Sequence, residues 1–478
     1  MTQPASTSTP VSIITPANVD LTPTLESTST PTQTATKLPA AGLSQEGPWL
    51  LLNTEQGLWA ANPDGTGGTL FSTGPVLIPG KLQNAVSSIG GHIAFLTYSG
   101  TPDGYFNYHG LKINILTMPQ FQSFLSIPLT SPETEPSADN PSDIIRAMVE
   151  YTSFAWSPEG KRLAYIGARE GPSTDLYEYP LDGGGAALRL TDGPDQAYDP
   201  KWSPDGTWIV HTAAAGFGTG AGIVVTGFYA ARADGGGVIS LYDIPKYSGG
   251  EDAVGWLNNH TLVTRSWFIT CGPSNLRLTD LSQEKSDVVF EGCLSSAAVA
   301  EGHGSVLFAQ SSETERFDTH PQPGMYLLTE ADPRPRLVSN ADIQEIIWSA
   351  GSGNYLARTS SGTLFEVSPT GDVRNLMDQI PQIPTVSPDG RHWAWAGSLM
   401  SNTPTGLWIG EYGRELHQIT SEDVTNTNFL WAPDGQSIYF VGSTGSLFRA
   451  QMPDWIPTIL AENLKAGGSG WPLAWVAG

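Results

Sequence analysis

Long apolar runs and basic residues are both scarce in this chain of 478 residues. No stretch approaches the ~20 consecutive apolar residues that a membrane-spanning helix needs, so we expect the chain as given to be soluble. There are 23 Lys and Arg against 47 Asp and Glu, a formal net charge of -24. A field of this sign repels phosphate backbones and argues against nucleic-acid partners. We interpret the acidic excess as a solvated surface, while cationic partners or divalent ions stay open.

Helical periodicity is also missing, with one short exception in "PSDIIRAMVEY", residues 141–151, which lies inside an insertion. Only 15% of the residues are charged, whereas the chain has 53 Gly and 37 Pro. This balance suits strands joined by many tight turns. The composition therefore favours strands over helices.

The first 46 residues form a Ser/Thr/Pro-rich tract that cannot bury enough apolar surface to fold. The tract lacks the basic segment, the apolar segment and the cleavage site of a secretory signal. We predict a disordered linker over residues 1–46 and one folded domain over residues 47–478. Such tracts resemble the stalks of bacterial lipoproteins, which implies a signal and a lipid anchor upstream of Met1. The alternative is a cytosolic protein with a disordered tail.

From Gly47 onward the sequence repeats one order of features: an apolar strand that often ends in Trp, a Ser-Pro-Asp-Gly turn, a second apolar strand and a third strand. The clearest copies begin at residues 154, 200, 384 and 429 and read "FAWSPEGKRLAYIG", "PKWSPDGTWIVHTA", "PTVSPDGRHWAWAG" and "FLWAPDGQSIYFVG". Degenerate copies begin at residues 85, 253, 297 and 345. Trp156, Trp202 and Trp256 are 46 and 54 residues apart (202 minus 156; 256 minus 202). A period of about 40 to 50 residues with four strands per unit predicts the blades of an all-β, closed β-propeller.

The repeated turn follows from its residues. Pro204 fixes φ at the second turn position, Asp205 can accept a backbone N–H, and Gly206 takes a conformation that a Cβ would oppose. Trp202 ends the inner strand with a large apolar area that can pack between blades. We therefore interpret the repeated phrase, including its Asp residues, as a packing and turn device.

The two ends of the repeat complement each other. Residues 47–71 supply the second to fourth strands of a blade, and "GWPLAWVAG" at the C-terminus supplies a lone first strand with Trp475 in the anchor position. We expect these ends to pair and close the ring, which removes exposed sheet edges. The anchors predict nine units: Val86, Trp156, Trp202, Trp256, Ala298, Trp348, Val386, Trp431 and Trp475. Because propellers typically have about four to eight blades, we expect eight or nine.

The repeated W-S-P-D-G phrase, followed by an apolar strand and a third strand that runs into an Asp-Gly turn, resembles the TolB-type, WD-like propeller repeat. The resemblance covers residues 47–478. It implies a bacterial, periplasmic or lipoprotein-like propeller that serves as a platform for protein binding. TolB itself carries an α/β domain before its propeller, where this sequence has only the Ser/Thr/Pro tract. Similar repeats form the propeller of prolyl-oligopeptidase-like enzymes, but the sequence has no G-x-S-x-G motif.

Motifs for catalysis or metal binding are absent. The eight histidines show no His/Cys ligand spacing, and no D-x-D-x-D-G calcium loop occurs. We predict no catalytic residue, no metal and no cofactor. A glycoside hydrolase or lyase with its site at the central channel stays the alternative, because paired carboxylates are placed by the fold and leave no spacing signature.

The two cysteines, Cys271 and Cys293, fall in connections on the same face of the predicted propeller. A disulfide between them is one reading, which would support an oxidising compartment, and two unpaired thiols are the other.

The insertions gather on that same face, away from the short repeated turns. Loops that a rigid scaffold projects often carry binding residues. Aromatic and Arg side chains favour interfaces, so we predict these binding residues: Tyr105, Tyr108, His109, Trp267, Phe268, Arg316, Phe317 and His320. Ordinary loops are the alternative. The sequence thus predicts a monomeric, envelope-associated, non-enzymatic propeller that binds a protein or glycan ligand through its long-loop face, with membrane contact only through the upstream lipid anchor.

Overall fold

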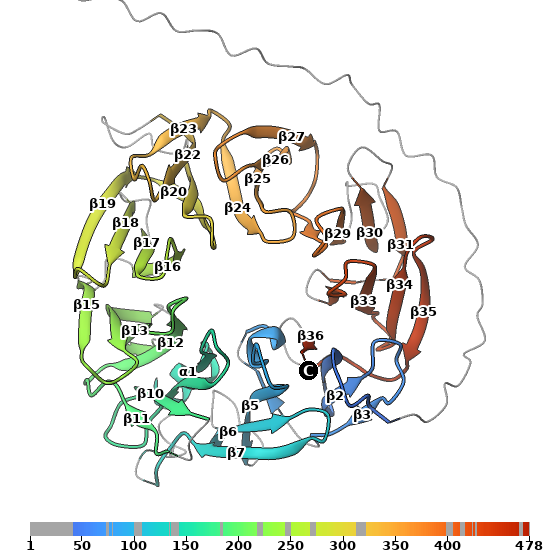
Figure 1. Ribbon diagram of the computed structural model, residues 1–478, viewed down its shortest axis with the longest axis horizontal. Helices are drawn as coiled ribbons and strands as arrows, with labels where there is room; N and C mark the ends of the chain where they lie inside the picture. The colour runs from blue at the N-terminus through green and yellow to red at the C-terminus, as the bar shows by residue number, and fades with distance from the viewer. Residues whose placement is uncertain are drawn as a thin grey trace, which may run out of the picture.

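The computed structural model describes residues 42–477 apart from 73–75, 79, 100–107, 133, 135–142, 182–184, 218–222, 244–249, 268–273, 312–321, 398–404, 412–415, 423, 426–427 and 468–471. Nine four-stranded antiparallel sheets follow one another around a ring (Figure 1). The prediction of an all-β propeller is confirmed, and the number of blades is nine.

Blades 1 to 3 contain the first and the last of the described strands. Blade 1 combines β36 (Leu473–Val476) with β1 (Trp49–Thr54), β2 (Gly57–Ala61) and β3 (Thr69–Leu70). Blade 2 contains β4 (Val76–Leu77), β5 (His92–Ser99), β6 (His109–Thr117) and β7 (Gln122–Pro128). Blade 3 contains β8 (Phe154–Trp156), β9 (Arg162–Gly167), β10 (Asp175–Pro180) and β11 (Leu188–Arg189).

Blades 4 to 6 form the next third of the ring. Blade 4 contains β12 (Gln196–Trp202), β13 (Trp208–Phe217), β14 (Ile223–Arg232) and β15 (Val238–Asp243). Blade 5 contains β16 (Gly250–Trp256), β17 (Thr261–Trp267), β18 (Ser274–Asp280) and β19 (Lys285–Gly292). Blade 6 contains β20 (Leu294–Ala300), β21 (Ser305–Gln310), β22 (Gly324–Thr329) and β23 (Arg336–Ser339).

Blades 7 to 9 complete the ring. Blade 7 contains β24 (Ile343–Ser349), β25 (Asn354–Thr359), β26 (Leu364–Val367) and β27 (Val373–Met377). Blade 8 contains β28 (Thr385–Val386), β29 (His392–Ala396), β30 (Leu407–Glu411) and β31 (His417–Thr420). Blade 9 contains β32 (Phe429–Trp431), β33 (Ser437–Val441), β34 (Leu447–Gln451) and β35 (Ile456–Ala461).

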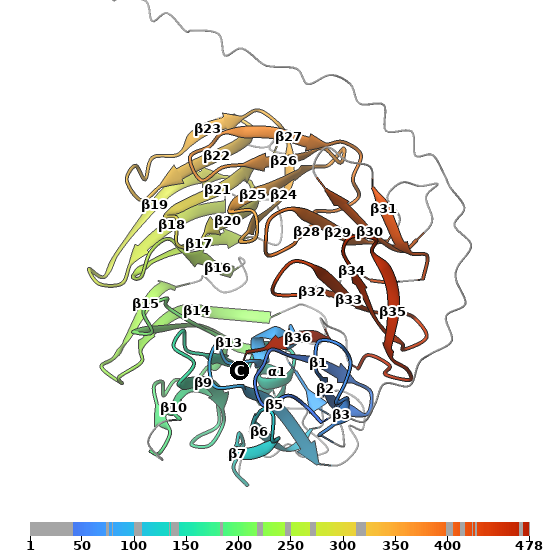
Figure 2. The ribbon, with the colours of Figure 1, turned by 45° about the vertical axis from the view of Figure 1, so that its right-hand side comes forward.

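The ring closes as the sequence predicts, by pairing of the C-terminal strand with the first blade. β36 is antiparallel to β1, with Leu50 opposite Trp475 and Leu52 opposite Leu473. The backbone N–H of Asn53 extends the pairing by donating to the carbonyl of Pro472 at 2.8 Å. In Figures 1 and 2 the red strand β36 lies beside the blue strands of blade 1. Pairing covers an edge of β1 that would otherwise be exposed.

The apolar core is divided among the junctions between neighbouring blades. Val210 and Phe228 of blade 4, for example, pack in one buried cluster with Leu262 and Leu281 of blade 5. Because middle strands have a blade on each side, β1, β2, β21, β29 and β33 are buried at every position. Outer strands such as β19 and β35 expose half or more of their residues. Burial thus explains why the middle strands are so uniformly apolar.

Blade 2 departs from the repeat at its inner strand. The sequence predicts that this strand contains Val86. In the structure the strand is β4 (Val76–Leu77), and it is followed by a 3-10 helix (Leu82–Ala85) and an isolated bridge from Val86 to Ile93. The predicted helix is present as α1 (Asp143–Val149), which lies in the connection from blade 2 to blade 3. Asp143 accepts a hydrogen bond from the N–H of Phe217, so α1 is joined to the end of β13.

The two faces of the ring differ in their connections. The turn face carries the turns between the first and second strands and between the third and fourth strands of each blade. The loop face carries the remaining connections, as far as the structure describes them.

Candidate functional site

The Ser-Pro-Asp-Gly turn of blade 4 satisfies its own polar groups. Asp205 accepts hydrogen bonds from the hydroxyl of Ser203 at 2.7 Å and from the N–H of Thr207 at 3.0 Å, and Gly206 has φ 69°. Partial burial raises the pKa of Asp205, but these hydrogen bonds outweigh that effect and lower it overall. The interpretation of this phrase as a turn device is consistent with these contacts.

A second recurrent device is the Trp at the end of an inner strand. The indole N–H of Trp156 donates to the carbonyl of Ala85 in the preceding blade, at 2.9 Å. Trp202 donates to Ala155 at 2.9 Å, and Trp475 donates to Trp431 at 2.7 Å. Trp431 in turn donates to Thr385 at 3.4 Å. These four indoles therefore join inner strands of neighbouring blades, in addition to filling space between them.

Neighbouring turns on the turn face also contact one another. Ser87 of blade 2 donates to the carbonyl of Gly160 in blade 3 at 3.0 Å, and Arg162 of blade 3 donates to the carbonyl of Gly206 in blade 4 at 2.8 Å. Between the described residues of the turns at 203–207 and 257–260 there is no such hydrogen bond. Such a hydrogen bond therefore joins the turns of blades 2 and 3 and those of blades 3 and 4, but not the described turns of blades 4 and 5.

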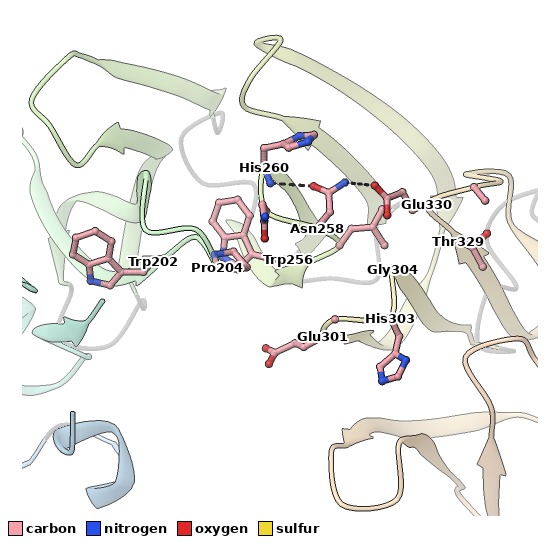
Figure 3. Close-up of a pocket in the computed structure, with 14 residues that line it drawn as sticks. Trp202, Pro204, Trp256, Asn258, His260, Glu301, His303, Gly304, Thr329 and Glu330 are labelled. Carbon is pink, nitrogen blue, oxygen red and sulfur yellow. Dashed lines mark hydrogen bonds between the residues drawn. The ribbon is translucent and has the colours of Figure 1, made fainter. Parts of the chain in front are cut away.

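A pocket of about 1060 Å³ lies at the turns of blades 4 and 5 (Figure 3). It is formed by the turns of blades 4, 5 and 6, and the lining residues are Trp202, Pro204, Trp256, Leu257, Asn258, Asn259, His260, Glu301, Gly302, His303, Gly304, Thr329, Glu330 and Ala331. All of these turns lie on the turn face, opposite the long loops. Its volume lies just above the range of about 300 to 1,000 Å³ that is usual for ligand pockets.

Asn258 organises the blade 5 side of the pocket. Its Oδ1 accepts hydrogen bonds from the N–H groups of His260 and Thr261, at 3.0 and 2.7 Å, which shapes the turn as an Asp would. Its Nδ2 donates to Oε1 of Glu330 in blade 6, at 2.7 Å (Figure 3). One side chain thus both forms the turn and holds a carboxylate of the next blade.

His260 lies beside a second carboxylate in blade 5. Its Nδ1 is 3.2 Å from Oδ1 of Asp280. Partial burial raises the pKa of Asp280, but hydrogen bonds from the hydroxyl and the backbone N–H of Ser282 outweigh that effect and lower it overall. Asp280 is therefore a stable negative charge behind the lining residues.

Two Trp side chains form the apolar part of the pocket. Trp202 is buried, and the guanidinium of Arg162 lies 4.6 Å from its ring centroid. Trp256 is half-buried and belongs to the junction between blades 4 and 5. On the blade 6 side, the ring of His303 lies 5.2 Å from that of Trp348. Aromatic surface and polar side chains from three blades therefore meet in one cavity.

The charged groups of the lining have one sign. Glu301 and Glu330 are lining residues, whereas none of the lining residues is Lys or Arg. In Figure 3, Glu330 points to Asn258, while Glu301 points away from both. The arrangement offers hydrogen-bond acceptors and aromatic faces, but the two carboxylates do not converge on one point.

Most of the binding residues predicted on the loop face lie outside the described residues: Tyr105, Phe268, Arg316, Phe317 and His320. Trp267 is the last residue of β17. Tyr108 packs edge-on against Tyr98, with 4.7 Å between ring centroids, and His109 begins β6. The predicted set therefore stays a prediction.

The predicted disulfide between Cys271 and Cys293 also remains a prediction. Cys293 lies half-buried between β19 and β20, and its N–H donates to the side chain of Gln310 at 2.8 Å. Cys271 lies outside the described residues, so the pairing stays a prediction.

Sequence reasoning missed this pocket because it treated every inner turn as scaffold. The signal was present in the degenerate copies: blade 5 has Asn-Asn-His and blade 6 has Glu-Gly-His-Gly where the repeat has Ser-Pro-Asp-Gly. The Ser-Pro-Asp-Gly turn uses its polar side chains in hydrogen bonds within the turn. Where two adjacent turns lack this sequence, their polar side chains can contact other groups.

Within the described ranges, no three or more His, Cys, Asp or Glu side chains are grouped so as to hold a metal ion. None of the described helices is both long and apolar enough to span a membrane.

Comparison with solved structures supports the fold. A crystal structure described as the eukaryotic initiation factor aligns over 90% of this chain and 98% of its own, with TM-score 0.55 and 12% identity. Dipeptidyl peptidase 4 of Porphyromonas gingivalis aligns over 81% of this chain and 60% of its own, with TM-score 0.52 and 10% identity. At such identities the likeness extends to the fold alone. TolB from Acinetobacter baumannii is also similar, at TM-score 0.30 and 13% identity, too low to support a shared role.

Sequence comparison gives only a local match. An uncharacterized peptidase, YuxL of Bacillus subtilis, is 46% identical over 67 residues, which is 14% of this chain and 10% of that protein. The chain therefore spans about a tenth of that relative. No protein-family model matches the sequence.

Proposed function

We propose that this chain is a binding protein, and that the turn-face pocket between blades 4, 5 and 6 holds part of a partner protein. The observation that carries the proposal is the replacement of two successive scaffold turns by polar turns that line a cavity with Trp202 and Trp256. A rigid ring fixes these turns, so little side-chain ordering is needed on binding. Aromatic anchors in a partly desolvated pocket are typical of interfaces.

Binding is favoured over catalysis by the positions of the carboxylates. A glycoside hydrolase needs two carboxyl groups on either side of one bond. Here Glu330 is engaged by Asn258, and Glu301 points elsewhere. The hydrolase alternative therefore has no pair of acids in this pocket to support it.

An envelope location is part of the proposal. It is supported by the Ser/Thr/Pro tract over residues 1–46 and by the resemblance of the repeat to TolB-type propellers. Fractionation of cells that express the gene naturally would test it, and recovery in the cytosolic fraction alone would contradict it.

Site-specific photocrosslinking tests the binding role. A photoreactive side chain replaces Asn259, an exposed lining residue, or Val288, an exposed residue on the outer strand of the same blade. We expect a discrete adduct from position 259 in cell extract and none from position 288, because only the first lies in the pocket.

The adduct must also depend on the pocket itself. Adding Trp256→Ala to the position 259 variant removes one aromatic wall and should abolish the adduct. Equal adducts at both positions, or an adduct that survives loss of Trp256, would show that the pocket is not the binding surface.

A further inference from the structure

We infer that the group held in this pocket is a cation, namely a lysine or arginine side chain of the partner protein. The inference rests on the proposed function and specifies the chemistry of the ligand. It follows from the charge of the lining, the orientation of one carboxylate and the aromatic walls.

The lining contains neither Lys nor Arg. Glu301 and Glu330 contribute negative charge, and Asp280 adds more behind His260. The nearby cation Arg162 is already committed, since its Nε donates to Glu159 at 2.6 Å and its Nη2 donates to Gly206 at 2.8 Å. An anionic ligand would therefore find no Lys or Arg side chain in the lining, whereas a cation would be attracted.

Glu330 is held in place before any ligand arrives. Backbone N–H groups fix the Asn258 amide, and that amide donates to Oε1 of Glu330. Gly304 leaves space beside Oε2, because a Cβ at that position would come within 3.1 Å of this oxygen. A carboxylate fixed through one oxygen can accept a cation's N–H groups with the other.

The aromatic walls match the same ligand. Trp202 already receives the guanidinium of Arg162 at 4.6 Å from its ring centroid, so a cation–π contact exists at the edge of this site. Trp256 presents a second, half-buried indole to the cavity. Trp faces attract ammonium and guanidinium groups more strongly than other aromatic rings do. Carboxylates and indoles together favour a cationic side chain.

The test measures binding of hexalysine amide to the full chain by isothermal titration calorimetry, with hexaserine amide as the neutral probe. The pocket variant is Glu301→Gln combined with Glu330→Gln. The matched control is Glu55→Gln combined with Glu291→Gln, which removes the same charge from two exposed sites on the loop face. Both variants keep side-chain size, and circular dichroism checks that both fold.

We expect the pocket variant to raise the Kd for hexalysine amide about tenfold, since two ion pairs at exposed carboxylates are lost. The control variant should change the Kd less than about twofold, because more distant charges are screened at 0.15 M salt. Trp256→Ala should also weaken binding, and hexaserine amide should not bind measurably.

Three results would overturn the inference. One is an equal loss of affinity in the pocket and control variants, which would indicate a general effect of the acidic surface. Another is hexaserine amide binding as tightly as hexalysine amide. The third is a neutral oligosaccharide, maltohexaose, that binds in a Trp256-dependent manner unaffected by the two Gln substitutions.

The photocrosslinking result separates this inference from the proposed function. If the adduct at position 259 persists and requires Trp256 while hexalysine amide fails these criteria, the pocket binds a partner and only the cationic class is wrong. If the adduct at position 259 is also absent or does not require Trp256, the proposed binding role is contradicted as well.

Discussion

His211 is an ionisable side chain buried inside blade 4. Its ring stacks on Tyr229, with 5.6 Å between centroids, and among the described residues Nδ1 has no hydrogen-bond partner. Burial disfavours the charged imidazole and lowers the pKa of His211 to about 4. The folded protein therefore holds this histidine in its neutral form at pH values where an unfolded chain would protonate it.

This difference predicts a pH-dependent stability. Between about pH 6.5 and pH 4 the unfolded state binds more protons at residue 211 than the folded state, so the free energy of unfolding falls as the pH falls. His211→Phe keeps an aromatic ring and removes the titration. The variant should gain stability relative to the wild type on acidification, by on the order of 2 to 3 kcal/mol at pH 4.

Urea unfolding of both proteins from pH 7 to pH 4 measures this effect. His417→Phe, at an exposed position on β31, is the control for the substitution itself. Parallel curves for the wild type and His211→Phe across this range would contradict the assignment.

At the scale of single elements, the inner-strand Trp offers a matched comparison. The indole of Trp156 donates to the carbonyl of Ala85 in the preceding blade, whereas no hydrogen bond of the Trp348 indole is found among the described residues. Trp156→Phe should lower the free energy of unfolding by about 1 kcal/mol more than Trp348→Phe, because one hydrogen bond between blades is lost in addition to ring area.

Chemical denaturation of the two variants measures the difference. If Trp348→Phe is as destabilising as Trp156→Phe, the Trp residues act by filling space and the indole hydrogen bond adds nothing.

The elements also show what sequence can predict in this fold. Strands and turns follow from local patterns, so Trp156, Trp202 and the Ser-Pro-Asp-Gly turns were placed correctly from sequence. The sequence did not place the inner strand of blade 2 correctly, because β4 is two residues long and a 3-10 helix separates it from Val86. The pocket was missed for another reason: Trp256 and Glu330 come from different blades, and only the curvature of the ring brings them together.

At the scale of the whole molecule, the ring is complete only when all nine junctions between neighbouring blades are packed. Blade 1 depends for this on the last strand, β36. Leu473 and Val476 of β36 are fully buried in blade 1 and its neighbours. Deleting residues 472–478 should lower the free energy of unfolding by on the order of 5 kcal/mol, because these side chains leave the core and β1 becomes an exposed edge.

The shortened chain can also be rescued. A synthetic peptide with the sequence of residues 472–478 should restore part of the lost melting temperature, and a peptide of the same composition in scrambled order should not. An unchanged melting temperature on deletion would mean that the ring does not depend on this closure.

Closure by β36 also sets an order of events during synthesis. Residues 49–61 of blade 1 are translated before the other eight blades, but their partner strand β36 is translated after all of them. Blades 2 to 9 can each form as their own residues emerge, whereas the edge of β1 stays unpaired until β36 has been made. Nascent chains are therefore most open to wrong pairing at blade 1, and a chain that terminates before β36 can never cover this edge.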